Sequence, residues 1–345
     1  MTKKYIVFII IMAMLVSLFA GCAKHQETAP ADASGSGQIE GTDETENTEL
    51  TVVRVAGLKG PTSIGLVKLM EDDQNGKTKN NYEFTVAGTA DEITPSLIQG
   101  TLDMAALPVN LASVLYNKTE GDIQVIAVNT LGVLNIVQKG TEINELSDLA
   151  GKTIYATGQG STPEYNLRYL LSQNGIDPDR DVTIEFKSEP AEIVNILSSS
   201  DEGIAMLPQP YVIAAMAQTE GLSIAMDLSS EWDALENGSK MVTGVIAVRR
   251  QFAEDNPTAV KDFLEEYAAS VEYVNGNIEE AAGLIEKYDL FKAAVAKKAI
   301  PFCNVVFISG QDMIDSVEGY LKVLYDEDPK AVGGTLPGTD FYYEG

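Results

Sequence analysis

The chain repeats one order of strands and helices at an interval of 100 residues. Identical residues recur at that interval in three places: Ala56, Gly60 and Thr62 as Ala156, Gly160 and Thr162; Glu92, Ile93 and Leu97 as Glu192, Ile193 and Leu197; and Ala105, Leu107 and Pro108 as Ala205, Leu207 and Pro208. Each copy reads as strand, glycine-rich turn and helix, then strand and helix, then a short strand ending in Leu-Pro. Alternation of short apolar strands with helical patterns is typical of α/β folds. The repeat therefore predicts two similar α/β lobes.

The turns between these elements indicate where a ligand binds. Gly57 and Gly60 in the first copy, and Gly158 and Gly160 in the second, let backbone approach whatever lies above the strand ends. Open α/β sheets bind ligands in the crevice outside the carboxyl ends of their strands, where helix N-termini offer unpaired N–H groups. Each turn alone is also compatible with a plain helix start. A dinucleotide fingerprint is absent, because Pro163 replaces its third glycine, and no Walker lysine motif is present.

The first residues have the three zones of a secretory signal. Lys3 and Lys4 precede an apolar run at 5–19, which is short for a membrane span, and small residues follow it up to Cys22. Residues 18–22 resemble a bacterial lipobox, whose cysteine receives a diacylglycerol lipid and becomes the new N-terminus; Phe19 departs from the usual leucine. We expect a signal peptide at 1–21 and a lipid on Cys22. An ordinary cleaved signal or an uncleaved anchor would also place the rest of the chain outside the cytoplasm.

Residues 22–49 combine the cysteine with a polar, acidic segment that has no apolar period, so we expect a disordered linker. The only histidine of the chain, His25, lies in this segment. Its position argues against Ser-His and Cys-His catalysis and against zinc capture by histidine. We therefore expect no enzyme activity, no metal site and no cofactor.

The chain is strongly acidic, with 51 acidic and 24 basic residues and a net charge of −27. Loss of Lys3 and Lys4 with the leader would make this −29. Such a surface disfavours nucleic acid and direct adsorption to anionic lipid, so a membrane contact is expected through the N-terminal lipid only. Cys303 has no disulfide partner if Cys22 carries lipid, and its apolar-leaning surroundings predict a buried, inert thiol.

Several segments together resemble a known family. The leader, the linker and the segments 55–62 (Val-Ala-Gly-Leu-Lys-Gly-Pro-Thr), 103–110 (Asp-Met-Ala-Ala-Leu-Pro-Val-Asn), 149–155 and 256–264 are similar to solute-binding proteins of ABC importers. The nearest group is the nitrate, aliphatic-sulfonate, taurine and thiamine-precursor binding proteins, and the resemblance covers about 50–325. It implies a two-lobed type II periplasmic-binding-protein fold with a central ligand crevice and two hinge crossovers.

The pattern places the lobes of such a fold. The strand at 134–138 would carry the chain into lobe two and the strand at 243–248 would return it. Lobe one would then comprise 50–132 and 245–345, and lobe two 133–244. The helices expected after residue 256 are interpreted as packing elements of lobe one.

The candidate ligand-binding residues are those of the repeated turns and the hinge return. They are Lys59, Pro61, Thr62, Ser63, Thr89, Asn110, Gln159, Ser161, Thr162, Gln209, Tyr211 and Thr243. Trp232 is interpreted as a lid or a surface contact. Whether it, Asp91 and Glu164 face the crevice stays open at this point.

The resemblance implies an extracytoplasmic, lipid-anchored and monomeric protein that delivers a small molecule to an ABC permease and its ATPase. The alternatives are an enzyme on the same fold, disfavoured by export and by the position of the histidine, and a sensor or adhesin without transport. Helix N-termini, hydroxyl-rich turns and Lys59 favour an oxyanion such as a sulfonate. No arginine stands in a matched turn, although anion clamps usually use one, so a neutral heteroaromatic ligand stays open.

Overall fold

The computed structural model describes residues 50–345. The expected signal peptide (1–21), the lipid on Cys22 and the linker (22–49) lie outside the described residues. The described part of the chain forms one compact unit. None of the helices in that unit is long and apolar enough to cross a membrane.

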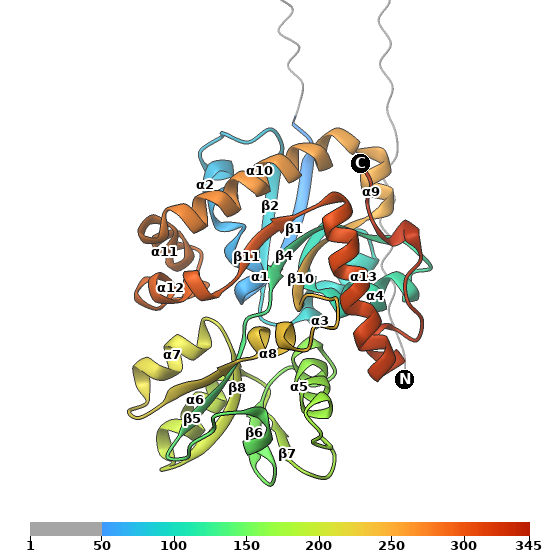
Figure 1. Cartoon of the computed structure of the whole chain (residues 1–345). Coiled ribbons are helices and arrows are strands. Elements are labelled where there is room, and N and C mark those ends of the chain that lie inside the picture. Colours follow the sequence, from blue (N-terminus) through green and yellow to red (C-terminus); the bar gives the residue numbers. More distant parts are fainter. Residues whose placement is uncertain (1–49) are drawn as a thin grey trace, which may run out of the picture. The chain divides into compact units, whose positions relative to one another are not determined.

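The first of two sheets in this unit, called sheet A, has six strands (Figure 1). In spatial order they are β11 (Val305–Ile308), β4 (Ile123–Leu131), β10 (Val242–Arg249), β3 (Met104–Pro108), β1 (Val52–Leu58) and β2 (Asn81–Ala87). Strand β1 runs parallel to both of its neighbours, whereas β10 is antiparallel to β3 and β4. Strand β3 is an unbroken apolar run because helices cover both faces of the sheet.

The second sheet, sheet B, repeats the core of this arrangement. Its five strands are, in order, β7 (Thr183–Phe186), β6 (Thr153–Ala156), β8 (Gly203–Pro208), β5 (Leu134–Lys139) and β9 (Ser223–Asp227). Strand β6 is parallel to β7 and β8, and β5 is antiparallel to β8, so β6, β7 and β8 correspond to β1, β2 and β3. The predicted α/β repeat is therefore confirmed.

Helices cover the sheets. They are α1 (Pro61–Ile64), α2 (Val67–Gln74), α3 (Ala90–Ile98), α4 (Val109–Lys118), α5 (Thr162–Gln173), α6 (Pro190–Ser199), α7 (Tyr211–Gln218), α8 (Leu228–Ala234), α9 (Arg250–Asp255), α10 (Pro257–Gly276), α11 (Ile278–Lys287), α12 (Ala293–Ala299) and α13 (Gly310–Glu327). One face of sheet A packs on α2, α10, α11 and α12, and the other on α3, α4 and α13. Figure 1 shows α10 and α13 over different parts of this sheet.

The chain passes between the sheets twice. It leaves sheet A between β4 and β5, at Gly132 and Val133, and returns after α8 to β10. Strand β10 begins earlier than the expected boundary at 245, because Val242 already pairs with Leu131 of β4. A side chain at Gly132 would meet the hydroxyl of Ser229, with an ideal Cβ only 2.1 Å from that oxygen. The same Cβ would lie 3.0 Å from the sulfur of Met241, which immediately precedes β10, so the two passages lie in close contact. The division into two movable lobes is kept as a proposal.

A buried aromatic group joins the helices of the two sheets. Trp232 of α8 is completely buried between Tyr169 of α5 and Tyr320 of α13, with ring centroids 4.8 and 5.3 Å away. Its indole nitrogen donates to the Ser239 hydroxyl at 3.1 Å, and the Tyr320 hydroxyl donates to Asn166. The interpretation of Trp232 as a lid or surface contact is therefore wrong. The residue belongs to a core that continues from sheet B onto α13.

A buried carboxylate joins three strands of sheet A. Asp103, 1 % exposed, directly precedes β3. One carboxylate oxygen accepts from the backbone N–H of Arg54 at 2.9 Å and from its guanidinium at 3.2 Å; the other accepts from Arg249 at 3.1 Å. Arg54 lies on β1 and Arg249 ends β10, so this one residue fixes the ends of strands that are distant in sequence.

The C-terminal residues dock on the chain itself. Phe341 is fully buried and its ring lies edge-on to Tyr116 of α4. Tyr342 forms a bridge to Val125 of β4, and the backbone N–H of Tyr343 donates to the carbonyl of Val125 at 3.0 Å. The described C-terminus therefore belongs to the sheet A half of the protein.

Cys303 is buried, as predicted, and burial raises the pKa of its thiol to about 12. Because the thiolate is the reactive form, we expect the native protein to leave Cys303 unmodified by N-ethylmaleimide at pH 8. Mass spectrometry of the peptide containing Cys303 checks this, with the same reaction in urea as the control. Labelling of the native protein as fast as of the unfolded chain would contradict the buried environment.

Candidate functional site

A cavity of about 320 Å³ lies where the strand ends of the two sheets meet. It is lined by Leu58, Lys59, Gly60, Pro61, Thr62, Gly88, Thr89, Pro108, Val133, Leu134, Ser161, Thr162, Pro163, Ser188, Glu189, Pro190, Ala191, Pro208, Tyr211 and Thr243. These residues come from the turns after β1, β2 and β3, from the equivalent turns after β6, β7 and β8, from the first passage between the sheets and from the start of β10, which follows the second passage. We call this cavity the cleft.

Eight of the twelve candidate residues lie in the cleft lining. They are Lys59, Pro61, Thr62, Thr89, Ser161, Thr162, Tyr211 and Thr243. Seven of them were chosen from the repeated turns, which face the same space because they belong to equivalent sheets. Thr243 was chosen from the hinge return. Their contact with a ligand stays a prediction.

Two other candidates, Ser63 and Asn110, point into the fold of the sheet A half. The Ser63 hydroxyl donates to the carbonyl of Leu58 at 2.6 Å and closes the turn from inside. Asn110 donates to the carbonyl of Ala331 at 3.2 Å and so holds the C-terminal segment on α4. Neither residue lines the cleft, and both have a structural role that helix spacing alone did not reveal.

The last two candidates, Gln159 and Gln209, differ in their exposure to solvent. Gln159 is exposed at the tip of its turn, whereas Gln209 is almost completely buried. The backbone N–H of Gln209 donates to the carbonyl of Val133 at 2.9 Å, which ties the end of β8 to the first passage. Neither glutamine lines the cleft.

Several lining residues were not among the candidates. They include four of the five lining prolines and the whole segment 188–191. The signal for that segment was available, because Glu189 stands 100 residues after Thr89, which was a candidate. Pro108 and Pro208 also match across the repeat and end β3 and β8. Applying the repeat interval to every turn would have found these residues.

Three threonine side chains supply buried polar groups to the cleft. Thr62 and Thr162 are related by the repeat and are 6 % and 2 % exposed. The Thr243 hydroxyl is buried and has no hydrogen-bond partner among the described residues. Gly244 follows it, where a Cβ would lie 2.6 Å from the methyl carbon of Thr62; glycine therefore lets α1 approach β10 closely. A buried hydroxyl without a partner is a natural contact point for a bound molecule.

Two glutamates outside the cleft lining form hydrogen bonds with the turns that line it. The Glu92 carboxylate accepts from the backbone N–H and the hydroxyl of Thr89 at 2.9 and 3.1 Å, as the capping-box spacing predicts. Glu164 instead accepts from the N–H of Gly160 at 2.7 Å and from Arg168 at 2.8 Å. Neither glutamate lines the cleft, so both act as capping groups.

The connection between α11 and α12 reaches the cleft from sheet A. Lys59 forms an ion pair with Asp289 at 3.2 Å. Tyr211, at the start of α7 in sheet B, lies edge-on to Phe291 with ring centroids 5.2 Å apart. Burial, followed by the Glu189 charge, raises the pKa of the Tyr211 phenol, which keeps its hydroxyl protonated. Helix α7 packs beside α12 (Figure 1), so this contact closes one side of the cleft.

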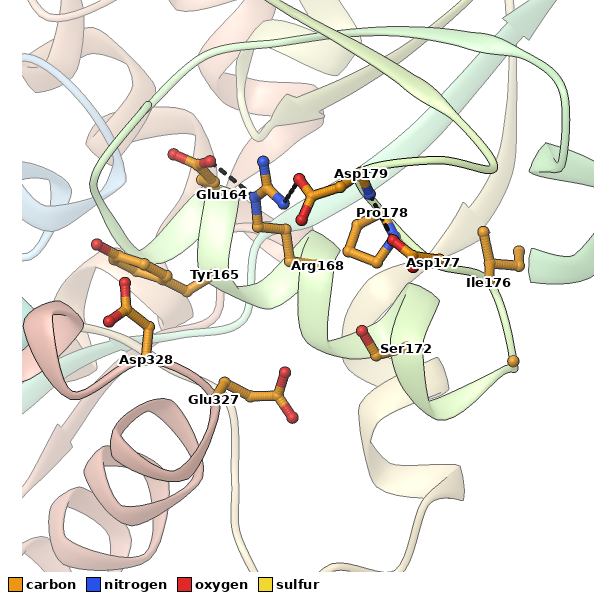
Figure 2. A pocket seen from close by; sticks show the side chains of 11 residues that line it. Glu164, Tyr165, Arg168, Ser172, Ile176, Asp177, Pro178, Asp179, Glu327 and Asp328 are labelled. Carbon is orange, nitrogen blue, oxygen red and sulfur yellow. Dashed lines mark hydrogen bonds and ion pairs between the residues drawn. The ribbon is translucent and has the colours of Figure 1, made fainter.

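A larger cavity of about 850 Å³ lies beside α5 (Figure 2). Figure 2 shows Arg168 between Glu164 and Asp179, with 2.8 Å contacts to both carboxylates. Glu327 and Asp328, at the end of α13, contribute further acidic groups. This cavity lies beside a helix, away from the strand ends, and its one arginine is already paired. Within 50–345 no cluster of histidine, cysteine or carboxylate side chains is arranged to hold a metal ion.

The family model described as the NMT1-like family matches residues 82–286, more than half of the chain. The protein belongs to this family. No curated protein matches it.

Solved structures share the fold. An ABC transporter structure from Parabacteroides distasonis is 24 % identical with a TM-score of 0.71, covering 85 % of this chain and 99 % of its own. The alkanesulfonate-binding protein SsuA from Xanthomonas axonopodis pv. citri, bound to MOPS, is 13 % identical with a TM-score of 0.67, covering 86 % and 99 %. The nitrate-binding protein NrtA from Synechocystis PCC 6803 is 14 % identical with a TM-score of 0.55, covering 77 % and 75 %. The expected type II periplasmic-binding-protein fold is confirmed.

Proposed function

We propose that the protein is a solute-binding protein that captures one small molecule in the cleft and delivers it to an ABC importer. The observation that carries the proposal is the lining of the cleft, which combines equivalent turns of both sheets with the first passage and the start of β10. A pocket of this size with a few buried hydroxyls suits a small ligand. The names of the neighbouring structures, which include sulfonate- and nitrate-binding proteins, support the same class.

Binding in this arrangement needs no covalent chemistry. A solute that contacts the turns of both sheets has more contacts when the lobes are closed, so it shifts the population towards the closed form. The passages at Gly132 and after α8 are the segments about which the lobes would rotate. The importer would then distinguish the loaded, closed form from the open one.

The remaining parts of the proposal concern location and partners. The leader and Cys22 support an extracytoplasmic protein held at the membrane by a lipid, within reach of a permease and its ATPase. The neighbouring periplasmic binding proteins support the extracytoplasmic location. The protein is proposed to act as a monomer.

A substitution that fills the cleft tests the proposal. Ala191→Trp places a large ring in the lining at an exposed position of α6, and Asn195→Trp adds the same ring on that helix outside the lining. We expect Ala191→Trp to weaken solute binding by about 100-fold or more, because the ring occupies the space of the ligand, and Asn195→Trp to leave binding unchanged.

A thermal-shift screen of the wild-type protein with sulfonates, nitrate, pyrimidines and flavins supplies the solute, since a ligand at 100 times its dissociation constant stabilises by about 2.7 kcal/mol. Calorimetry then measures its affinity for each variant. Equal binding by both variants would refute the cleft as the capture site.

A further inference from the structure

We infer that the cleft takes an uncharged, flat aromatic or heteroaromatic solute rather than an oxyanion; this inference rests on the proposed function and names its ligand class. Oxyanions are held by free N–H groups at helix N-termini, by arginine or by unpaired lysine. Around this cleft prolines remove some of these donors, carboxylates stand beside others, and the lining holds one lysine and no arginine. What is left is a set of apolar walls with a few hydroxyls.

Prolines remove donors at the helix starts that face the cleft. Pro61 is the first residue of α1, Pro190 is the first residue of α6, and Pro163 is the second residue of α5. A proline at such a position has no N–H, although the fixed φ angle suits a helix start. Pro108 and Pro208 likewise stand in the lining at the ends of β3 and β8. Five of the twenty lining residues therefore offer no backbone N–H to an anion.

Carboxylates also stand at the helix starts around the cleft. Glu92 takes the N–H of Thr89 before α3, and Glu164 takes the N–H of Gly160 before α5. Glu192 lies in the first turn of α6, and Glu189 in the lining itself. These groups satisfy the positive ends of the helix dipoles and would repel a second negative charge.

Two cations near the cleft already lie beside carboxylates. Lys59, the one basic residue in the lining, pairs with Asp289 at 3.2 Å. The nearby Arg168 lies outside the lining and is held between Glu164 and Asp179. These carboxylates offset the attraction of the two cations for an oxyanion, and the bidentate arginine contact typical of carboxylate and sulfonate sites is absent from the lining.

The remaining surface fits a flat, uncharged ring. Proline rings from both sheets, with Leu58, Val133 and Leu134, form apolar walls, and the Tyr211 ring is held in place by Phe291. The hydroxyl of Thr243, which has no partner among the described residues, offers one donor and one acceptor to a ring heteroatom or hydroxyl. Apolar walls with a few polar groups are the usual composition of small-molecule sites, and the polar groups free in this one are uncharged hydroxyls.

Matched pairs of compounds test the inference. Each pair is a ring with an uncharged substituent and the same ring with a sulfonate, such as pyridine-3-methanol with pyridine-3-sulfonate and indole with indole-5-sulfonate; nitrate and methanesulfonate complete the set. Thermal shifts of the wild-type protein and of the Ala191→Trp variant identify binding in the cleft. We expect the uncharged members to raise the melting temperature of the wild-type protein and their sulfonates to leave it unchanged. The Ala191→Trp variant should show no shift with either. Thr243→Val should weaken that binding about 3- to 10-fold, with Thr183→Val on β7 as the control.

The outcomes separate the ligand class from the function. A shift with a sulfonate or with nitrate that Ala191→Trp abolishes would overturn the uncharged class and leave solute capture intact. Shifts confined to uncharged compounds but unchanged in Ala191→Trp would overturn both the inference and the cleft as the capture site. If no uncharged ring produces a shift, the inference is wrong.

Discussion

Replacing Asp103 by alanine is expected to lower the free energy of unfolding by about 3–5 kcal/mol. The carboxylate is buried between Arg54 and Arg249, and it receives a backbone N–H as well as both guanidinium groups. Its loss leaves the largely buried Arg249, whose side chain is 16 % exposed, without its counter-charge. The substitution also removes the side-chain links among the ends of β1, β3 and β10, although the backbone bonds of residue 103 to Arg54 and Arg249 remain.

Urea unfolding followed by circular dichroism measures this loss. Glu83→Ala is the matched control, because Glu83 pairs with the same Arg54 at 3.6 Å but its side chain is 63 % exposed. An exposed pair of this kind contributes about 0–1 kcal/mol, so the control should stay close to the wild-type protein. A loss of the same small size in Asp103→Ala would show that the buried carboxylate does not hold the sheet together.

Replacing Trp232 by alanine is expected to cost about 3–5 kcal/mol, because a fully buried indole would leave a cavity among Tyr169, Tyr320 and the surrounding core. The effect should reach beyond one helix, since these three rings come from α8, α5 and α13. Trp232→Phe keeps a ring in place and loses the contact to Ser239, so we expect a smaller cost of about 1–2 kcal/mol.

Chemical unfolding monitored by circular dichroism measures both variants. In the wild-type protein the single tryptophan also reports on the same site, and its fluorescence should shift to longer wavelength on unfolding. A cost below about 1 kcal/mol for Trp232→Ala would mean that the surrounding side chains collapse into the space, and that the aromatic group is not essential for joining the two halves.

The topology was predictable because the repeat encodes it. Matching residues such as Leu107 and Leu207 stand in equivalent strands, and their spacing predicts equivalent sheets. Side-chain direction was not predictable in the same way. Ser63 follows Thr62 directly, yet one hydroxyl closes the turn and the other side chain lines the cleft. The dihedral angles of a turn decide between these outcomes, and residue type at a helix start is compatible with both.

The position of Trp232 was unpredictable for a different reason. Its local sequence is polar and acidic, which favoured a surface position. The residues that bury it lie far away in the sequence, on α5 and α13. Long-range packing of this kind overrides local composition, and only the assembled fold reveals it.

The sequence analysis favoured an oxyanion and left a neutral heteroaromatic ligand open; our inference selects the second. Helix starts and hydroxyls near Thr89 and Ser161 indicated anion binding. The structure adds that the Glu92 and Glu164 carboxylates stand at these helix starts and accept backbone N–H groups there, which supports the inferred neutral ligand. The same residues that make these helices start well therefore make the cleft less suited to an anion.

The core that runs from sheet B across Trp232 onto α13 has a consequence for how the molecule loses its structure. Packing across the two halves couples their stabilities, so heat or denaturant should remove both in a single cooperative step. A truncated protein that contains sheet B without α13 would expose the side of α5 that Tyr320 covers. The protein is therefore expected to unfold as one unit, and closure of the proposed lobes would have to leave that shared interior packed.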